Sequence, residues 1–351
     1  MKITAAVLDA IGAVGPFAET QPMRLAALDL APPRDGELLV KIDACGLCHS
    51  DLSVVNGDRP RPMPMAIGHE AAATVLQSSP GSSFAPGDRV VLAFLPSCGK
   101  CPTCASGQGY LCASAAAANG AGMLMHGGSR LAENGHAVHH HMGVSAFATH
   151  SVIDERSAVK IPSDIAPEIA ALFGCAVLTG VGAVFNTAQV RPGESVALYG
   201  LGGVGLAALL GALAAGAQPV IAVDPVAAKR ELALELGAAA AVHPDDAAAT
   251  VAALTNGGAD VAIESVGRAK VLADAYKSTR RGGRTITVGL PNPAEMLEIT
   301  AVSLVGDGKT LMGSYMGSSI PSRDIPRYIA LWRAGRLPVE RLLTSTSPLS
   351  E

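Results

Sequence analysis

The sequence has few aromatic side chains, few charges and no long apolar segment. Its 351 residues include six Phe, five Tyr and one Trp, so Ala and the aliphatic residues must fill the core. The 26 Lys and Arg residues form no basic block, which argues against nucleic acid or an anionic membrane surface as the main partner. No run of about 18 apolar residues predicts a transmembrane helix, and Met1–Ala5 does not resemble a secretory signal. We therefore expect a cytoplasmic protein of two domains, since a domain has roughly 100–200 residues.

The seven cysteines are the first specific feature. Their count is odd and no export signal precedes them, so metal binding is a better interpretation than a disulfide framework. Four of them follow the pattern C-x2-C-x2-C-x7-C, at Cys98, Cys101, Cys104 and Cys112. Interspersed Gly and Pro predict a tight loop rather than a helix or strand. Four thiolates suit a closed, structural zinc site; the alternative is a group of small buried side chains.

Three further candidate ligands are dispersed along the chain. Cys48 follows an expected strand at 37–42, His69 precedes one at 71–76, and Cys175 lies just before the second half. Two Cys and one His from separate segments would leave a fourth coordination position free, as catalytic zinc requires. Spacing alone is weak evidence, because each residue is also compatible with an ordinary core Cys or surface His.

The pattern of expected elements changes near residue 195. Before that point, short strands between turns predict a β-rich domain, with strands at 3–8, 38–43, 72–76 and 89–92. After it, strands at 195–199, 219–223, 260–264 and 284–288 alternate with helices at 203–215, 226–236 and 269–279. This alternation predicts a doubly wound parallel sheet, and therefore an α/β fold class.

A glycine-rich turn opens the second region, with the sequence Gly200-Leu201-Gly202-Gly203-Val204-Gly205. It fits G-x-G-x-x-G between a strand and a helix, the context in which this motif predicts dinucleotide binding. Gly200 permits the tight turn, Gly202 lets backbone amides approach a pyrophosphate, and Gly205 lets the helix pack closely. The helix N-terminus then faces the phosphates.

An acidic residue follows the second strand of this region. Asp224 lies 19 residues after Gly205, where a carboxylate accepts hydrogen bonds from the adenosine ribose and repels a 2′-phosphate. This predicts NAD rather than NADP as the cofactor; the alternative is a solvated Asp at a strand end. Lys229 is a second candidate for the ribose, or else an exposed helical Lys.

Taken together, these motifs resemble the zinc-dependent medium-chain alcohol dehydrogenases. The resemblance covers nearly the whole chain, in order: Gly-Leu-Cys-His-Ser-Asp, Gly-His-Glu, the four-cysteine lobe, Gly-Cys-Ala-Val-Leu-Thr-Gly and the glycine turn. It implies a β-rich, GroES-like catalytic domain at 1–176 with a zinc lobe at 96–113. It also implies a Rossmann NAD-binding domain at 177–319 and a return to the catalytic domain at 320–351. The family usually continues about twenty residues further, so this return is expected to be incomplete.

The resemblance assigns roles to individual residues. It implies that Cys48, His69 and Cys175 bind the catalytic zinc, so that two zinc ions and NAD are expected. Other residues implied to act in catalysis are Ser50, which contacts the substrate oxygen, Asp51, which orients the ligand His, Glu70 near the metal, and Ser53. Residues implied to contact the cofactor are His49, Thr179, Gly200, Gly202, Gly203, Val204, Gly205, Asp224 and Lys229. Phe94, Arg59 and Met142 are implied to line the substrate pocket.

Several positions depart from the family pattern. Ser53 stands where many members carry a proton-relay His, so a water chain or another base must serve. The segment Ala113–Ala117 lacks the Arg of glutathione-dependent formaldehyde dehydrogenases, which disfavours that subtype. Arg59 stands where many relatives have an apolar pocket residue, and it either pairs with an acidic or polar substrate or lies at the rim in water. The segment from Asn119 to His141 is typical of the longer, dimeric members, with His139–His141 as a loop feature or a metal tract. Cys45 is expected to be a small core residue.

The sequence thus predicts reversible hydride transfer between an alcohol and NAD, giving an aldehyde or ketone. The alternative is a catalytically silent NAD-binding relative that acts as a sensor or structural partner. A homodimer is implied by the resemblance, with sheets joined through the strand near 310–314. The identity of the alcohol is left open.

Overall fold

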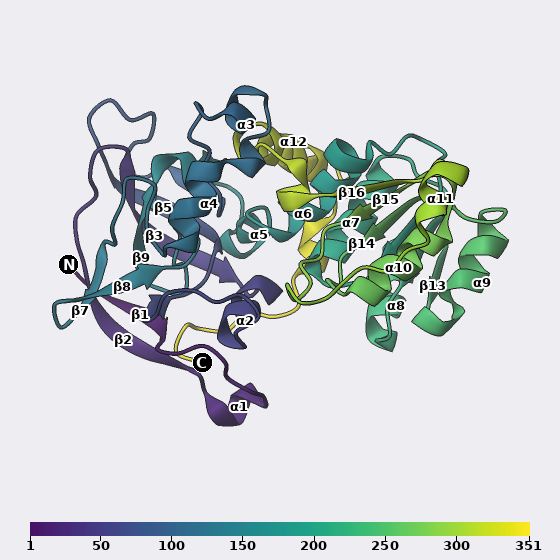
Figure 1. Ribbon diagram of the computed structural model, residues 1–351. Helices are drawn as coiled ribbons and strands as arrows, with labels where there is room; N and C mark the ends of the chain where they lie inside the picture. The colour runs from purple at the N-terminus through teal and green to yellow at the C-terminus, as the bar shows by residue number, and fades with distance from the viewer. The chain divides into compact units, whose positions relative to one another are not determined.

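The computed structural model describes residues 1–351, which divide into two compact units. Unit 1 contains Met1–Cys175, Ile320–Pro326 and Leu343–Glu351, and unit 2 contains Ala176–Ser319 and Arg327–Leu342 (Figure 1). The sequence assigned all of 320–351 to the catalytic domain, whereas 327–342 belongs to unit 2. Arg336 donates to the Ala214 carbonyl there, and Arg341 pairs with Glu235. None of the helices is both long and apolar enough to span a bilayer.

Unit 1 is built from a small closed barrel and a five-stranded sheet. The barrel contains, in order, β1 (Lys2–Leu8), β2 (Met23–Leu30), β7 (Leu131–Glu133), β8 (His136–His140) and β4 (Met65–Ala66). The sheet contains, in order, β10 (Ala158–Lys160), β6 (Arg89–Leu92), β5 (Glu70–Ser78), β3 (Glu37–Gly46) and β9 (His150–Asp154). Each has its own core of aliphatic side chains and Ala, as the scarcity of aromatic residues requires.

The helices of unit 1 are short and lie between strands. They are α1 (Phe17–Thr20), α2 (His49–Val55), α3 (Pro102–Ala105), α4 (Ala113–Gly120) and α5 (Pro167–Leu172). The cysteine lobe was predicted to contain no helix, yet α3 and a 3₁₀ turn at Gly109–Leu111 lie within it. Pro102 occupies the first turn of α3, a position where its missing N–H costs nothing.

Unit 2 contains a six-stranded parallel sheet. Its spatial order is β13 (Ala240–Val242), β12 (Val220–Val223), β11 (Val196–Tyr199), β14 (Ala259–Glu264), β15 (Thr279–Thr287) and β16 (Thr310–Gly313). Numbered along the chain, this is the order 3-2-1-4-5-6 of a Rossmann fold. β11 and β12 are buried throughout, as expected for strands covered on both faces. The predicted fold class, a GroES-like domain plus a doubly wound parallel sheet, is confirmed.

The helices of unit 2 lie before, between and after these strands. They are α6 (Ala176–Gly182), α7 (Gly203–Ala214), α8 (Ala227–Glu235), α9 (Pro244–Leu254), α10 (Ala269–Ser278), α11 (Ala301–Gly306) and α12 (Pro321–Arg333), the last beginning in unit 1. α6 continues into a π-helical turn at Ala183–Ala188. Strand β11 and helix α7 meet at residues 200–202, which places the glycine turn at the carboxyl edge of the sheet. Ligands bind at this edge in open α/β folds.

Candidate metal centres and dinucleotide site

Three separated segments of unit 1 bring Cys48, His69 and Cys175 together. Cys48 precedes α2, His69 precedes β5, and Cys175 follows α5. Their ligand atoms all lie within 4.8 Å of one another, and the two sulfurs are 3.9 Å apart. Two thiolates bound to one tetrahedral zinc at about 2.3 Å would be separated by about 3.8 Å. A disulfide needs sulfurs about 2.05 Å apart, so the pair is open.

His69 is buried, and its two ring nitrogens have different surroundings. Nδ1 lies 3.0 Å from Asp51 Oδ1, whereas Nε2 has no hydrogen-bond partner although no solvent reaches it. A buried nitrogen without a partner is costly. A carboxylate on one ring nitrogen and an unpaired second nitrogen is the arrangement of a metal-binding imidazole. The donor set therefore fits a zinc ion, with Nε2 as the ligand atom.

Asp51 connects two of these candidate ligands. Its Oδ2 accepts a hydrogen bond from the Cys48 backbone N–H at 3.1 Å, and its Oδ1 faces His69. Burial alone would raise the pKa of Asp51, but the imidazoles of His69 and His141 hold that pKa below its ordinary value. The carboxylate stays ionised and fixes the orientation of the His69 ring.

The thiols of the same group are electrostatically coupled. The hydrogen bond from Cys175, together with His69, lowers the pKa of Cys48 to about 4 against the opposing effect of burial. The pKa of Cys175 is raised by the same contact and by burial. One thiolate is thus formed readily, which suits metal binding, because thiolates rather than thiols are the ligands.

The other predicted catalytic residues lie on the segments that directly follow Cys48 and His69. Ser50 is half-buried in the first turn of α2, and Glu70 is buried and lies close enough to Gly46 that a Cβ there would be 3.0 Å from its carboxyl carbon. Ser53 is buried, and its hydroxyl donates to the His49 carbonyl at 3.0 Å. Its hydroxyl therefore satisfies the backbone of α2. His49 itself is exposed.

Two of the predicted pocket residues are buried, and one of them contacts His69. The Phe94 ring meets the His69 ring edge to face, with centroids 5.4 Å apart. The Phe94 carbonyl also accepts a hydrogen bond from Asn119, whose amide lies beside the turn that follows Met142. Arg59 is half-buried, and its backbone N–H donates to the Ser53 carbonyl.

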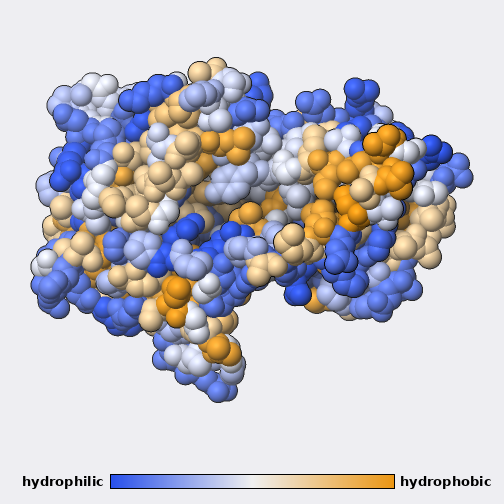
Figure 2. Space-filling view, in the orientation of Figure 1, coloured by the Kyte–Doolittle hydropathy of each residue, from blue (hydrophilic) through white to orange (hydrophobic).

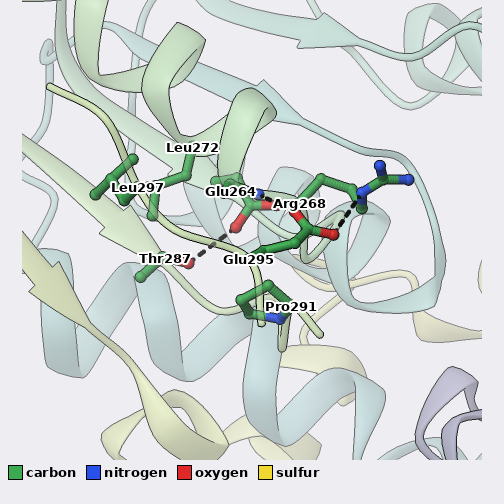
Figure 3. A pocket seen from close by; sticks show the side chains of 8 residues that line it. Glu264, Arg268, Leu272, Thr287, Pro291, Glu295 and Leu297 are labelled. Atoms are coloured by element: carbon green, nitrogen blue, oxygen red, sulfur yellow. Dashed lines mark hydrogen bonds and ion pairs between the residues drawn. The ribbon is translucent and has the colours of Figure 1, made fainter. Parts of the chain in front are cut away.

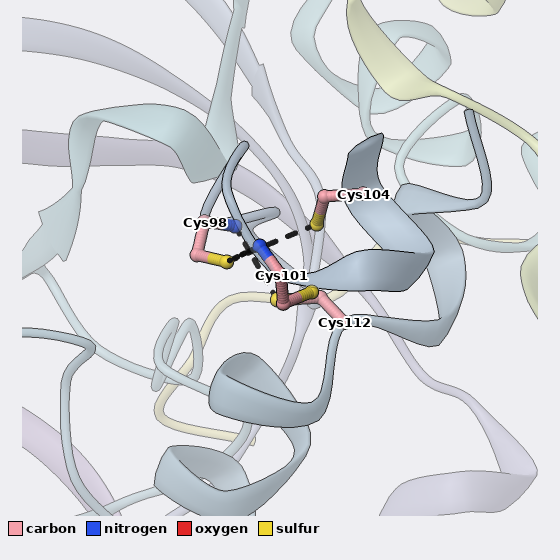
Figure 4. Close-up of side chains that lie close together, drawn as sticks. All are labelled: Cys98, Cys101, Cys104 and Cys112. Carbon is pink, nitrogen blue, oxygen red and sulfur yellow. Dashed lines mark hydrogen bonds between the residues drawn. The ribbon is translucent and has the colours of Figure 1, made fainter. Parts of the chain in front are cut away.

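The four remaining ligand candidates form a second group. Figure 4 shows the sulfurs of Cys98, Cys101, Cys104 and Cys112 turned toward a common centre, with Sγ–Sγ distances of 3.9 Å for Cys98–Cys104 and 4.0 Å for Cys101–Cys112. Backbone N–H groups donate to Cys98 Sγ and Cys112 Sγ, each at 3.3 Å. These distances again match a tetrahedral zinc, here with all four positions filled by protein.

In unit 2, the glycine turn has the backbone geometry that the motif predicts. Gly200 has φ +95°, in the region that favours glycine. A Cβ on Gly205 would overlap the carbonyl oxygen of Gly200. Gly202 is the N-cap residue of α7, and a Cβ there would meet nothing within 4 Å. The open space beside Gly202 and the free N–H groups of α7 form a cradle suited to a pyrophosphate.

Asp224 lies at the carboxyl end of β12 and is buried. Its two oxygens accept hydrogen bonds from the N–H groups of Leu201 and Val226, at 2.8 and 2.9 Å. The acidic side chain is thus tied to the glycine turn itself. Lys229 is exposed on α8, whereas Arg230, which the sequence analysis overlooked, donates to the carbonyls of Asp224 and Pro225.

The remaining cofactor candidates lie where α6 and α7 pack together. Thr179 is buried on α6, and Gly180 beside it is so close to the Val204 carbonyl that a Cβ would overlap it. Gly203 and Val204 form the first turn of α7. The structure thus places Thr179 and Val204 on neighbouring helices next to the glycine turn.

A small cavity lies near the carboxyl end of β14 (Figure 3). Its volume is about 60 Å³, far below the roughly 300–1,000 Å³ of ligand pockets. Glu264 lines it and accepts hydrogen bonds from the Gly267 N–H and the Thr287 hydroxyl, while Arg268 pairs with Glu295. Burial raises the pKa of Glu264. These contacts anchor the loop after β14.

Two expectations are corrected by the structure. Cys45 is exposed near the end of β3 and is not a core residue. His139–His141 is not a simple loop feature, because His139 and His140 belong to β8 and both His140 and His141 are buried. His141 lies 3.2 Å from Asp51, a contact that the sequence analysis missed. Three consecutive histidines carry no spacing that could have singled out the third.

Comparisons with known proteins agree with this architecture. The family model for the alcohol dehydrogenase GroES-like domain matches residues 34–163, and the model for zinc-binding dehydrogenase matches 203–333. Geraniol dehydrogenase from Castellaniella defragrans is 40% identical, covering 97% of this chain and 90% of its own. An S-(hydroxymethyl)glutathione dehydrogenase from Synechocystis sp. is 35% identical, covering 100% and 95%. The crystal structure of benzyl alcohol dehydrogenase from Acinetobacter calcoaceticus matches with a TM-score of 0.91 at 33% identity, covering 98% and 92%.

The fold, the two sulfur-rich ligand sets and the glycine turn define a zinc-binding, NAD(P)-dependent oxidoreductase. With these matches, the chain belongs to the zinc-dependent medium-chain alcohol dehydrogenase family. Its activity is hydride transfer between an alcohol and a nicotinamide cofactor.

Proposed function

We propose that the chain is an NAD-dependent dehydrogenase that interconverts an apolar primary alcohol and its aldehyde at Cys48, His69 and Cys175. The observation that carries the assignment of the site is the unpaired, buried Nε2 of His69 beside two sulfurs 3.9 Å apart. Three protein ligands leave a fourth position for substrate. Zinc bound there supplies a Lewis acid, which lowers the pKa of an alcohol and polarises a carbonyl.

The surrounding residues would orient the ligands and handle the proton. Asp51 holds the ionised carboxylate that keeps the His69 proton on Nδ1. Ser50, half-buried at the start of α2, would donate to or accept from the substrate oxygen. Because the Ser53 hydroxyl is bound to the His49 carbonyl, a water chain is the better candidate for carrying the proton onward.

NAD rather than NADP is supported by Asp224. Its carboxylate, at the end of β12, accepts hydrogen bonds from the backbone N–H groups of Leu201 and Val226, so it cannot readily turn away from a ribose bound beside the glycine turn. A 2′-phosphate there would meet a fixed negative charge.

The substrate class is supported by the names of two relatives and by a feature of α4. Geraniol and benzyl alcohol both carry a hydroxymethyl group on an unsaturated apolar skeleton. Helix α4, which directly follows Cys112, contains no basic side chain that could hold the carboxylates of a glutathione adduct. We therefore favour allylic or benzylic alcohols over S-(hydroxymethyl)glutathione, despite the relative of that name.

A homodimer is supported by the edge of the unit 2 sheet. β16 is an edge strand, and the neighbouring α11 has no buried residue. Val302 and Val305 on that helix are 70% and 87% exposed, and Figure 2 shows hydrophobic surface gathered there. An unpaired strand edge beside exposed apolar residues suits pairing with a second copy across a two-fold axis. A cytoplasmic location suits the reduced thiolates that both ligand sets need.

The test is turnover by zinc-loaded protein with NADH or NADPH and three aldehydes: geranial, benzaldehyde and acetaldehyde. In the opposite direction, oxidation of geraniol by NAD is compared with oxidation of the formaldehyde–glutathione adduct, whose hydroxymethyl group is at the alcohol level. We expect oxidation of NADH with geranial and benzaldehyde, with NADPH at least about tenfold slower. Preference for the glutathione adduct would refute the substrate class, and preference for NADPH would refute the role of Asp224. No turnover by protein holding two zinc ions would favour a silent NAD-binding relative.

A further inference from the structure

His141 lies against the proposed catalytic zinc site, although it is not among the ligands. Its side chain is 0% exposed, and its ring meets the His69 ring edge to face with centroids 5.5 Å apart. Its Nδ1 lies 3.2 Å from Asp51 Oδ1, the same oxygen that faces His69 Nδ1. Both His141 nitrogens are buried and neither has a hydrogen-bond partner, while Nδ1 lies within ion-pair distance of Asp51.

The backbone holds His141 at this place. Its N–H approaches the Ala66 carbonyl at the end of β4 and the Ser145 hydroxyl, at 3.2 and 3.1 Å. Its carbonyl accepts hydrogen bonds from the N–H groups of Val144 and Ser145. In the turn that follows, Met142 and Ser145 have φ of +50° and +51°, which non-glycine residues rarely adopt. The fold therefore maintains an unfavourable turn directly after His141.

The contacts of Asp51 show what His141 can do there. One carboxylate oxygen faces the backbone N–H of Cys48, and the other faces the rings of His69 and His141. Because an ionised carboxylate only accepts hydrogen bonds, the nearest nitrogen of each ring must carry a proton to interact favourably. The Nδ1 atoms of both rings lie 3.0 and 3.2 Å from this one oxygen, so rotation of the carboxylate would change its electrostatic contact with both rings.

We propose that His141 is a positioning residue of the zinc site: it holds Asp51 in the rotamer that orients His69 Nε2 and the Cys48 backbone toward the metal. The proposal rests on the zinc assignment made above. It concerns a hydrogen-bond donor at Nδ1 and needs no change in the charge of His141. A ring that merely fills space would have the same volume but would not act on the metal.

Three variants separate these roles. His141→Phe keeps an aromatic ring but removes the donor. His141→Asn restores an N–H group at the same bonded distance from Cβ as Nδ1, in a smaller side chain. His139→Phe, on the half-buried histidine of the same tract, controls for an added phenyl ring near β8.

The measurement is the rate at which zinc passes from each purified protein to an excess of a chromophoric chelator. The Cys98–Cys112 cluster serves as an internal reference, because its ligands include neither Asp51 nor His69. We expect His141→Phe to accelerate release of the zinc ion bound at Cys48, His69 and Cys175 by about tenfold. This is the low end of the 10–100-fold loss of affinity typical when a partner of a metal ligand is removed. Release of the zinc ion bound at the Cys98–Cys112 cluster should be unchanged. An unchanged rate would also show that the cysteine lobe is folded.

We expect His141→Asn and His139→Phe to release zinc nearly as the unmodified protein does. With cobalt bound at Cys48, His69 and Cys175, the visible absorption bands should shift in His141→Phe and return toward their original position in His141→Asn. Equal release rates for His141→Phe and the unmodified protein would overturn the proposal. Equally fast release from the Phe and Asn variants would also overturn it, since the volume of the ring would then matter rather than its donor. If the unmodified protein held only one zinc, the proposed catalytic site itself would be refuted.

Discussion

Gly202 and Gly205 lie three residues apart in the glycine turn, and the structure predicts opposite consequences for replacing each by Ala. A Cβ on Gly205 would overlap the Gly200 oxygen and lie 2.8 Å from the Gly200 carbonyl carbon, where contacts normally need about 3.5–4.0 Å. The helix must therefore move by close to 1 Å. Such overpacking costs about 3 kcal/mol, the upper part of the usual range. With a urea dependence of about 2 kcal/mol per molar, the unfolding midpoint should fall by about 1.5 M.

Gly202→Ala should leave stability nearly unchanged. Gly202 has φ −71° and ψ −176°, which Ala adopts freely, and no atom lies within 4 Å of the added Cβ. The methyl group would instead occupy the space that a pyrophosphate needs. Loss of one charge-assisted hydrogen bond costs about 1.5–3 kcal/mol, so NADH should bind about 10–100-fold more weakly, at 1.4 kcal/mol per tenfold.

The fluorescence of Trp332 allows the unfolding of unit 2 to be measured specifically. Trp332 is the only tryptophan in the chain, and its indole N–H donates to Glu340 within the same unit. Its fluorescence can follow urea unfolding of that unit in the full-length protein, and calorimetric titration with NADH gives affinity. Unchanged NADH affinity in Gly202→Ala would refute the placement of the pyrophosphate. An unchanged midpoint in Gly205→Ala would refute the close approach of helix and turn.

Three further predictions concern unit 1. Cys48→Ala should abolish turnover and reduce zinc from two ions to one per chain by elemental analysis; full activity would refute the ligand assignment. Burial and then Arg130 lower the pKa of His140 to about 3, against about 6.5 when unfolded. Because only the unfolded chain takes up this proton, stability is lost as the pH falls below 6.5, by about 2 kcal/mol at pH 5. His140→Gln should lose about 2 kcal/mol less than the unmodified protein between pH 7 and pH 5 in urea unfolding followed by circular dichroism; identical losses would contradict this. Arg130→Met removes the ion-pair partner that binds the buried Glu37 carboxylate at 2.6 Å and leaves the Arg34 backbone N–H as a donor to it. The substitution should cost about 3 kcal/mol, the low end of the range for a broken buried pair, by the same measurement; a loss below 1 kcal/mol would refute this.

Local sequence signals predicted unit 2 well because its function and its folding depend on short-range patterns. The predicted helix at 203–215 is α7 to within one residue. In unit 1, the predicted strand at 89–92 coincides with β6. The glycine motif specifies a turn within six residues, and the close packing of Gly205 against Gly200 is part of that turn. Elements without such a pattern were missed, among them β13, whose three residues are all half-buried.

The metal site is different, because its geometry depends on residues far apart in the sequence. Motif resemblance selected Cys48, His69 and Cys175, but neither spacing nor composition could show that His141 would join them. That residue is placed by the parallel pairing of β4 with β8, in which Ala66 lies opposite His140. The same β4 leads within three residues to His69, so one strand pairing positions both histidines.

Asp51 shows why local and long-range requirements converge at this site. Within α2 it is an ordinary capping residue, since its carboxylate accepts from the Cys48 N–H three residues earlier. This capping role can be predicted from the sequence, and any acidic side chain that rotates freely could fill it. The other oxygen, however, faces His69 from one segment and His141 from another. The orientation of the Asp51 carboxylate is thus fixed only when the barrel closes. The geometry of the metal site should therefore change when the pairing of β4 with β8 is disturbed.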